Sequence, residues 1–322
     1  MNIYNDFDLK SLLWYKIGGV AKCLLECKSK KDVLEALEFV HKNNINKFFI
    51  IGTGSNLVFS DNYFDGAIIY LAKPENPSFQ KDGDIVTAYA GEILGEFVQF
   101  SLDHNLIGLE WAGGLPGTVG AAVRGNVGAY GGEIKDSVQE VEVALIEDSV
   151  VTVKTFTNHE LLFSYRHSLI KAHNDSMVVL SVTLKLKQGS EEEVIEAKRV
   201  RDLHIQQRKD KHPLEYPNCG SVFKNIHKKE DVERVLAVYP ELSEKIKNDW
   251  YGKVSMAYLI QKLGLQGYRV GNAQVSEKHA LFIVNLGGAK SSDVKSIINT
   301  VQEKCKEVFG FTPEIEVEIV EN

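Results

Sequence analysis

The amino-acid sequence predicts an α+β protein with more than one domain. Its 322 residues correspond to about two domains of roughly 150 residues, or to three smaller ones. Strand-like and helical patterns alternate over residues 17–70, short β patterns fill the middle of the chain, and the last third is rich in helical patterns. Apolar residues make up 44% and charged residues 25% of the chain. This composition is ordinary for a globular protein and excludes the disordered and fibrous classes.

The first region begins with a strand and a helix. Residues 21–28 are expected to form a strand, because two cysteines and Leu25 share one face at a period of two. A helix is expected over residues 30–43, where apolar side chains recur at helical spacing. Ser29 precedes this helix, and Asp32 is placed to close a capping box with it.

Further strands complete the first region and open the second. Residues 47–51 and 67–71 read as strands, and a Pro/Asn/Ser cluster at 74–78 marks a domain boundary. The second region, about 79–209, opens with a strand over 84–90 and a helix that follows it. The apolar stripe of that helix consists of Ile93, Leu94, Phe97, Val98 and Leu102. Later strands are expected over 138–145, 150–155 and 177–186.

A third region begins near residue 210 and contains clear helix endings. The helical pattern of residues 255–263 stops at Gly264, and that of residues 292–308 stops at Gly310. A strand is expected between them, over residues 280–285. We therefore expect an α+β region distinct from the first two.

The charge and the cysteines limit the functional classes. Formal charge is 37 − 44 = −7, which argues against a generic surface for nucleic acid or acidic membranes but permits local basic pockets. The four cysteines, at 23, 27, 219 and 305, are too few for a disulfide framework, and Cys23-x-x-x-Cys27 lacks structural-zinc spacing. We interpret them as reduced thiols in a cytosol, with Cys23 and Cys27 in the core rather than chemically active. No signal peptide or membrane span is expected, and the nine histidines predict no catalytic metal.

The first informative motif is Gly52-Thr53-Gly54-Ser55-Asn56, which directly follows a strand pattern. It resembles a dinucleotide glycine loop, but a Rossmann site needs a helix immediately after the turn, and here another apolar strand-like run follows. Glycines between two strands can form a nest of backbone N–H groups that binds an anion. The alternative is a tight β-turn that binds nothing.

The second motif is the segment GGLPGTVGAAVRGNVGAYGG at residues 113–132, which holds eight of the 26 glycines. Each glycine placed where alanine would fit lowers the stability of the fold by roughly 0.5–1 kcal/mol. Some other interaction must offset this cost. One explanation is close approach of the backbone to a flat or phosphorylated ligand, and the other is a series of strained turns. We favour the ligand, because two such loops can converge on the two ends of one dinucleotide.

Taken together, the motifs resemble the UDP-N-acetylenolpyruvoylglucosamine reductase (UDP-N-acetylmuramate dehydrogenase) family. The similarity spans nearly the whole chain, and the motifs stand in the family's order. They are Ile17-Gly18-Gly19, Gly52–Asn56, Gly114-Leu115-Pro116-Gly117-Thr118-Val119-Gly120, Asn126-Val127-Gly128-Ala129-Tyr130-Gly131, Tyr165-Arg166-His167-Ser168, Gly220-Ser221-Val222-Phe223-Lys224-Asn225 and a C-terminal strand containing Glu316.

The resemblance implies an NADPH-dependent FAD enzyme that reduces UDP-N-acetylglucosamine enolpyruvate in peptidoglycan synthesis, and thus serves cell-wall biogenesis, cell shape and division. It implies a cytoplasmic protein that acts without nucleic acid or membrane, and we expect a monomer. FAD would be noncovalent, in a two-lobed vanillyl-alcohol-oxidase/PCMH-like fold, with a third α+β domain closing over the UDP-sugar. The implied FAD-binding residues are Gly52, Thr53, Gly54, Ser55, Asn56, Gly114, Pro116, Gly117, Thr118, Gly120, Asn126, Gly128, Ala129 and Tyr130.

The resemblance also assigns three catalytic residues. Ser221 would donate a proton to the carbon next to the substrate carboxylate, once hydride from flavin N5 has reached the vinyl carbon. Arg166 would bind the developing carboxylate charge through its bidentate fork. Glu316 would polarise or protonate the enolate; periodicity alone predicts only that its face of the strand over 314–319 is solvated.

The implied substrate contacts are Tyr130, Arg166, Lys224, Asn225 and Gln274. The sequence departs from the family at three positions: Glu318 replaces an arginine, Ile226 replaces a proline and His167 replaces an aspartate. Between residues 198 and 212, six basic residues outnumber two acidic ones. These basic residues could bind a diphosphate, although such a pattern more often indicates a solvated helix face.

The family resemblance implies three domains. These are an FAD-binding subdomain over residues 1–73, a second over 74–209 joined by the C-terminal strand 311–322, and a substrate-binding domain over 210–310. Two alternatives remain at this point. One is an FAD-dependent sugar or alcohol oxidase of the same fold, which would not need the serine of the GS-x-FKN motif. The other is a flavin-binding protein that has lost turnover.

Overall fold

The computed structural model of the chain describes residues 1–148 and 150–321. By internal contact the chain forms two compact units. The first unit consists of residues 1–7, 21–53 and 64–208, and the second of residues 8–20, 54–63 and 209–321. The predicted division into three domains concerns smaller parts than these units and stays a prediction.

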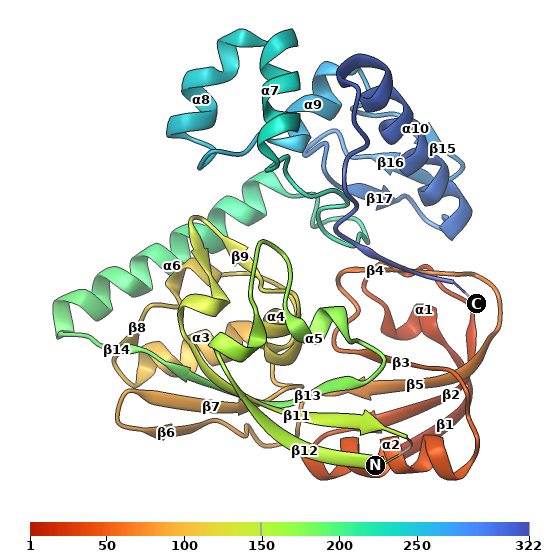
Figure 1. Ribbon diagram of the computed structural model, residues 1–322, viewed down its shortest axis with the longest axis vertical. Helices are drawn as coiled ribbons and strands as arrows, with labels where there is room; N and C mark the ends of the chain where they lie inside the picture. Colours follow the sequence, from red (N-terminus) through yellow and green to blue (C-terminus); the bar gives the residue numbers. More distant parts are fainter. Residues whose placement is uncertain (149, 322) are drawn as a thin grey trace. The chain divides into compact units, whose positions relative to one another are not determined.

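The first unit contains a four-stranded sheet built around a parallel β-α-β connection (Figure 1). Its strand order is β1 (Asn2–Asp8), β2 (Val20–Cys27), β5 (Phe64–Leu71), β3 (Phe48–Ile51). Strand β5 runs parallel to both β2 and β3. The helix α2 (Lys30–Lys42) makes the crossover that a parallel arrangement requires. All three strands and the helix expected from the sequence are present.

The start of α2 differs in one detail from the expected capping box. The Ser29 hydroxyl accepts a hydrogen bond from the Asp32 N–H at 3.2 Å, as predicted. The Asp32 carboxylate, however, accepts from the Lys28 N–H at 3.0 Å rather than from Ser29, and it also pairs with the amino group of Met1 at 2.7 Å. The second hydrogen bond of the capping box is therefore made to the N–H of Lys28, one residue before the expected Ser29.

A five-stranded antiparallel sheet forms the other part of the first unit. Its order is β12 (Val150–Thr157), β11 (Val138–Glu147), β13 (Met177–Lys185), β7 (Ile85–Tyr89), β6 (Gln80–Asp82). Apolar side chains from both sheets belong to one continuous core. The predicted apolar stripe lies on α3 (Leu94–Asp103), where Leu94, Phe97, Val98 and Leu102 are buried. Cys23 and Cys27 are buried in this core, as expected.

The glycine-dense segment is more ordered than the sequence indicates, because it contains the short helix α4 (Val119–Arg124). Several of its glycines lie where the chain approaches itself closely. A Cβ on Gly113 would lie 2.5 Å from the backbone oxygen of Arg201, and a Cβ on Gly132 would lie 2.4 Å from the ring of Trp111. Close packing of the chain therefore accounts for part of the glycine content, and glycine density alone does not indicate a ligand.

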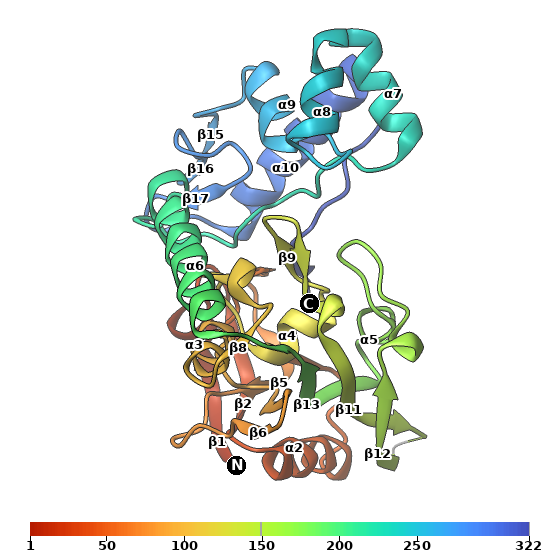
Figure 2. The same ribbon diagram turned by 90° about the vertical axis from the view of Figure 1, so that its left-hand side faces the viewer.

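Shorter elements connect these parts of the first unit, and a long helix ends it. The helix α6 (Glu191–Lys211) crosses the first unit's boundary by three residues and is drawn in green in Figure 2. The shorter elements are β8 (Leu106–Ile107), η1 (Glu110–Ala112), β9 (Gly128–Ala129), β10 (Gly132–Glu133), η2 (Ile134–Asp136), η3 (His159–Leu161), α5 (Leu169–Ala172) and β14 (Lys187–Gln188).

The second unit has its own core and two small sheets. Strand β4 (Leu57–Phe59) pairs in parallel with β18 (Glu318–Val320), and β15 (Arg269–Val270), β16 (Ala273–Val275) and β17 (Ile283–Asn285) form an antiparallel sheet. The C-terminal strand is shorter than expected and pairs with the segment that follows the GTGSN motif. The helices are α1 (Leu9–Leu12), α7 (Lys229–Val238), η4 (Pro240–Leu242), α8 (Ser243–Asn248), α9 (Met256–Lys262) and α10 (Ser291–Phe309).

The helix endings of the second unit follow the sequence closely. Gly310 caps α10 at φ = +75° in the left-handed region, as a glycine at this position predicts. Ser255 caps the start of α9 by accepting from the Tyr258 N–H. Among the helices of the described ranges, none has both the length and the apolar character that crossing a bilayer requires.

Candidate active site

The two glycine motifs meet in the first unit. Gly52 follows directly on β3, and a Cβ there would lie 2.6 Å from the hydroxyl oxygen of Thr118. Thr118 is the N-cap of α4, where its hydroxyl accepts from the Ala121 N–H at 3.3 Å. The backbone at Gly52 can approach Thr118 only because it lacks a side chain. The first and second predicted FAD motifs therefore share one location.

A pocket that is open to solvent lies at this location. Apolar side chains form most of its wall, and Arg124 and Asn174 are its two long polar residues. The lining residues are Phe49, Ile50, Gly52, Leu71, Thr118, Gly120, Ala121, Arg124, Ile170, Asn174, Met177, Val178 and Val179. An apolar cavity with a few polar groups suits part of a dinucleotide. The residues present therefore fit FAD.

A second cluster of predicted residues surrounds Asn126, which is fully buried with φ = +43°. Its side-chain nitrogen donates to the Ser164 carbonyl at 2.8 Å and to Glu133 at 3.2 Å. Its side-chain oxygen accepts from the Lys135 N–H at 3.3 Å. Asn126 thereby joins the NVGAYG motif to the segment that carries Arg166.

Arg166 lies at the tip of a two-residue turn. Ser164 and His167 exchange backbone hydrogen bonds of 3.1 and 3.0 Å across this turn, and Arg166 has φ = +57°. A non-glycine residue in the left-handed region stores strain, which tends to occur at functional sites. The guanidinium donates to the Gly128 carbonyl at 2.6 Å. Arg166 is thus held against the NVGAYG motif, as a shared site requires.

Three motifs meet in the second unit, although they are far apart in the sequence. The nearest atom to a Cβ built on Gly220 is the carbonyl oxygen of Ser55, at 3.8 Å. The Asn56 side chain donates to the carbonyl of Glu316 at 3.3 Å, across 260 residues. The Glu316 N–H donates to the Val222 carbonyl at 2.8 Å. The GTGSN turn, the serine motif and the C-terminal glutamate therefore lie together.

The turn that carries Ser221 is fixed by the residues before it. The Asn218 carboxamide is buried, and its oxygen accepts from the Gly220 N–H at 3.0 Å. Its nitrogen donates to the carbonyls of Tyr216 at 2.9 Å and Pro213 at 3.3 Å. Gly220 has φ = +78°, a conformation that favours glycine. Cys219 between them is fully buried, and burial raises the pKa of its thiol to about 12, so it is chemically inert at neutral pH.

Sequence reasoning missed Glu314, which lies two residues before Glu316. Its carboxylate pairs with Lys228 at 2.6 Å and with Lys224 at 2.9 Å. Hydrogen bonds from Lys228 and Lys224 lower the pKa of Glu314 to about 2. Lys224, a predicted substrate contact, is therefore ion-paired to a carboxylate. The alternating glutamates of the last strand were visible in the sequence, but their lysine partners were not.

The other predicted substrate contacts have structural partners as well. The Asn225 side-chain oxygen accepts from the Met256 N–H at the start of α9, at 3.1 Å. The Gln274 side chain donates to the Gly267 carbonyl at 3.0 Å. Tyr130 is exposed, with φ = +51°, and its ring stacks on His204. Gly114 and Pro116 are exposed, and the Gly117 carbonyl accepts from the Leu94 N–H at 3.1 Å.

One departure from the family has a physical explanation. Ile226 is buried, donates its N–H to the Val254 carbonyl at 3.0 Å and accepts from the Val254 N–H at 2.8 Å. A proline at position 226 could not make the first of these bonds. His167 is exposed on its turn, and Glu318 uses its backbone N–H to bind the Asn56 carbonyl at 3.0 Å.

The proposed residues divide between the two units. Arg166, Tyr130 and the residues of the pocket belong to the first unit, and Ser221, Glu316 and Lys224 belong to the second. Over residues 1–148 and 150–321, no group of three or more histidine, cysteine or acidic side chains is arranged to hold a metal ion.

Family models match two parts of the chain. The model described as "UDP-N-acetylenolpyruvoylglucosamine reductase, C-terminal domain" matches residues 212–320, and one described as "FAD binding domain" matches residues 21–154. The UDP-N-acetylenolpyruvoylglucosamine reductase of Caldicellulosiruptor bescii is 36% identical over 315 residues, which cover 98% of this chain and 90% of that protein. That of Lactobacillus acidophilus is 35% identical over 320 residues, covering 99% and 95%.

A solved structure agrees with these sequence relatives. The crystal structure of the UDP-N-acetylenolpyruvylglucosamine reductase from Thermus caldophilus has a TM-score of 0.75 and 28% identity, and the match covers 100% of both chains. The predicted α+β fold, an FAD-binding fold with an additional C-terminal domain, is confirmed, as is the resemblance inferred from the motifs.

Proposed function

Because the chain belongs to the UDP-N-acetylenolpyruvoylglucosamine reductase family, FAD-binding oxidoreductases of peptidoglycan precursor synthesis, we propose that it reduces UDP-N-acetylglucosamine enolpyruvate with electrons from NADPH in the cytoplasm. The observation that supports the proposal is that the segments carrying Ser55, Ser221 and Glu316 lie together in the second unit, through contacts of Gly220 with Ser55, Asn56 with Glu316 and Glu316 with Val222. One of these residues comes from an FAD motif, and the other two come from the predicted proton-transfer motifs.

Bound FAD would supply the redox chemistry, which is the transfer of a hydride from NADPH to the vinyl carbon of the substrate. The protein's part is to hold the substrate and to move one proton. Arg166 binds the substrate carboxylate, where negative charge develops, because its guanidinium presents a planar fork of donors and is held in place by the Gly128 carbonyl. Gly52, Thr118 and Gly120 offer backbone to the cofactor at the pocket.

Ser221 donates the proton to the carbon adjacent to the carboxylate. A hydroxyl is a weak acid and must be aimed, and the hydrogen bonds that Asn218 makes around Gly220 support that aim. Glu316 polarises or protonates the enolate. Glu314 is the competing carboxylate, but two lysines keep it ionised to about pH 2, which makes it a poor proton donor.

The test follows the visible spectrum of the purified protein under anaerobic conditions, first with NADPH and then with the enolpyruvyl sugar. We expect NADPH to bleach the flavin and the sugar to restore its colour. Ser221→Ala should bleach normally but reoxidise about 10²–10⁴ times more slowly, because general acid catalysis contributes that much. Recovery with oxygen but not with the sugar would indicate an oxidase instead. A protein that neither carries nor binds FAD would overturn the proposal.

Two glutamine variants decide which carboxylate takes part. Glu316→Gln should slow reoxidation by the sugar more than Glu314→Gln does, while both variants should be bleached by NADPH. If Glu314→Gln slows reoxidation more than Glu316→Gln does, Glu314 rather than Glu316 takes part in the reaction. Near-normal turnover in Ser221→Ala would show that another group donates the proton.

A further inference from the structure

The turn that carries Arg166 has an unusual backbone. Ser164 and His167 are its first and fourth residues, and the His167 N–H donates to the Ser164 carbonyl at 3.0 Å. A turn with positive φ at its third residue ordinarily has glycine or asparagine there, but here the third residue is Arg166, with φ = +57°. Such a conformation persists only where the surrounding structure holds it. The turn therefore depends on contacts that compensate for its strain.

Lys171 supplies one of these contacts. Its ammonium donates to the Arg166 carbonyl at 3.1 Å in a partly buried place. Lys171 lies five residues after Arg166, in the short helix α5. A hydrogen bond from a charged donor is stronger than one from a neutral donor, and partial burial reduces the competition from water. The ammonium therefore fixes the direction in which the Arg166 carbonyl points.

The backbone of Lys171 is itself anchored. The hydroxyl of Ser168, the N-cap of α5, accepts from the Lys171 N–H at 3.1 Å. The same hydroxyl donates to the Arg124 carbonyl at the end of α4, at 2.6 Å, and Ser168 is fully buried. Lys171 thus extends from a backbone that Ser168 connects to α4.

The other end of Arg166 is placed by a glycine. The guanidinium donates to the Gly128 carbonyl at 2.6 Å, and a Cβ built on Gly128 would lie 3.2 Å from Nη1 of Arg166. This contact orients the guanidinium, but the side chain extends from a Cα whose position the turn determines. A misplacement of about 1 Å can slow a reaction about a hundredfold. Arg166 therefore needs support at its backbone as well as at its guanidinium.

We infer that Lys171 is a positioning residue, which holds Arg166 so that its guanidinium can bind a substrate carboxylate. It acts through the Arg166 backbone and not by contact with the substrate. The inference rests on the proposed function, because the carboxylate is that of the enolpyruvyl sugar. The sequence motif that contains Arg166 ends at Ser168, so Lys171 lies outside every motif that indicated the site.

The test is Lys171→Met, which keeps most of the length of the side chain but removes the ammonium. Reoxidation of the NADPH-reduced protein by the enolpyruvyl sugar should slow about tenfold to a hundredfold, the effect that loss of a hydrogen bond to a charged group commonly has. Bleaching by NADPH should be unchanged. Lys171→Arg, which keeps a charged donor, should retain most of the parent rate.

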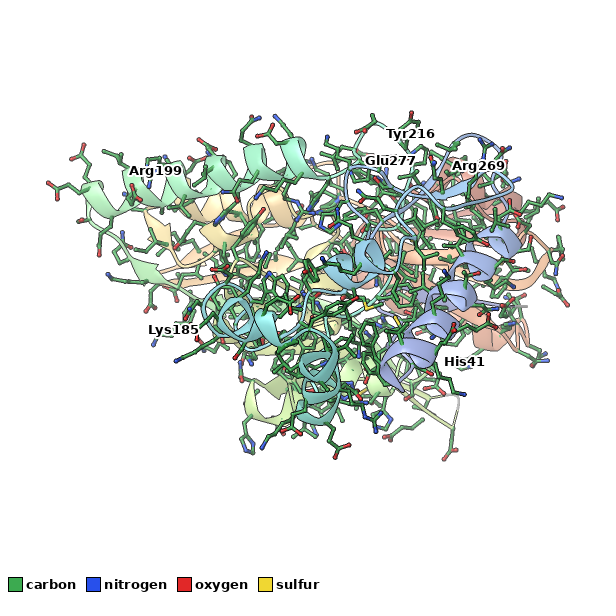
Figure 3. All side chains as sticks on the ribbon, turned by 90° about the horizontal axis from the view of Figure 1, so that it is seen from above. His41, Lys185, Arg199, Tyr216, Arg269 and Glu277 are labelled. Atoms are coloured by element: carbon green, nitrogen blue, oxygen red, sulfur yellow. The ribbon has the colours of Figure 1, made fainter. Side chains whose placement is uncertain are left out.

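Lys185→Met is the matched control, because it makes the same change at an exposed lysine of the first unit. Lys185 is labelled in Figure 3, and its ammonium lies 3.9 Å from the carboxylate of Asp84. This variant should match the parent protein in both half-reactions. Reoxidation of Lys171→Met at the rate of this control would overturn the inference, and so would equal slowing of bleaching and reoxidation in Lys171→Met.

A double variant tests whether Lys171 acts through Arg166. Arg166→Met alone should slow reoxidation strongly, and the addition of Lys171→Met should then have almost no further effect, because residues that act through one interaction are not additive. If the two effects multiply instead, Lys171 acts on the reaction independently of Arg166, and the positioning role is wrong.

Amide hydrogen exchange measured by NMR tests the inference without turnover. In Lys171→Met the His167 N–H should exchange about tenfold faster than in the parent protein or faster still, because the turn opens more often. Unchanged exchange at His167 would overturn the inference even if the enzyme is active. A protein whose turn is loosened by Lys171→Met, but which the enolpyruvyl sugar does not reoxidise, would fail only the proposed function. If Lys171→Met does not fold, Lys171→Gln, whose side chain is one bond shorter, should give the same results.

Discussion

Asn218 shows how a single buried side chain can shape the turn that carries the proposed proton donor. Its carboxamide makes the hydrogen bonds to Pro213, Tyr216 and Gly220 described above, and none of these partners is Ser221 itself. We therefore regard Asn218 as a positioning residue. It holds the backbone on which the proposed proton donor depends.

Asn218→Ala should slow reoxidation by the enolpyruvyl sugar at least tenfold while leaving bleaching by NADPH unchanged. In a Ser221→Ala background the same change should have almost no further effect on reoxidation, because two residues that act through one step are not additive. Stopped-flow measurement of both half-reactions checks this.

Asn285 supplies the control for that experiment. It is also buried, accepts from the Gly287 and Ala289 N–H groups, and donates to the Tyr15 carbonyl. Asn285→Ala should lose comparable stability, roughly 1–3 kcal/mol for the unpaired groups, without a selective effect on reoxidation. Equal slowing in both variants would mean that Asn218 acts only through stability.

At the residue scale, the sequence indicates candidate functional residues better than it indicates the residues that they contact. Ser221 could be singled out only because of its motif, since a serine after glycine is common in turns. The pairing of Lys224 with Glu314 could not be predicted, because it joins residues 90 apart through tertiary structure.

At the scale of elements, the paired backbone bonds between Ile226 and Val254 connect the serine motif to the segment before α9. Ile226→Pro, the residue typical of the family, should lower the free energy of unfolding by roughly 1–3 kcal/mol, because the Val254 carbonyl loses its donor in a buried place. Urea unfolding measures this. Ile226→Val, which keeps the N–H, should cost only about 0.5–1.5 kcal/mol. A proline variant as stable as the valine variant would show that the bond contributes little.

Most strands and helices were predictable from periodicity and caps, and the exceptions have physical reasons. The helix α4 escaped prediction because glycine normally disfavours helices, and only its packing and the Thr118 cap explain it. The C-terminal strand was predicted too long because residues 314–316 alternate like a strand while bonding to residues 222–224 through only isolated contacts.

At the scale of the whole molecule, the ion pairs of Glu314 predict an acid-sensitive contribution to stability. The pKa of Glu314 falls from an ordinary 4.5 to about 2 in the folded protein. The unfolded state therefore binds the proton more tightly, and stability from this group is present above about pH 4.5 and lost as the pH falls towards 2. The carboxylate is partly exposed, so the contribution is modest and weakens with salt.

Comparing the parent protein with Glu314→Gln by thermal unfolding checks this dependence. The difference in melting temperature should be constant above pH 5 and should shrink between about pH 4.5 and 2. Glu321→Gln, which removes an exposed ion pair with Lys295, is the control and should show a smaller pH dependence. A constant difference down to pH 2 would contradict the lowered pKa.

The division into compact units could not be derived from the sequence. Composition and length indicated several domains, but nothing in residues 8–20 or 54–63 distinguishes them from their neighbours as parts of the second unit. Their membership depends on long-range contacts, such as Tyr15 and Val58 in the second core.

The parallel pairing of β4 with β18 has a consequence for synthesis on the ribosome. The Asn56 side chain, next to β4, binds the Glu316 carbonyl 260 residues later, so the GTGSN turn is synthesised early and waits until those residues have been added. At about 5–20 residues per second, that delay is on the order of tens of seconds. Until then the nascent chain exposes β4 without a partner. The second unit therefore cannot complete its fold until β18 has been synthesised.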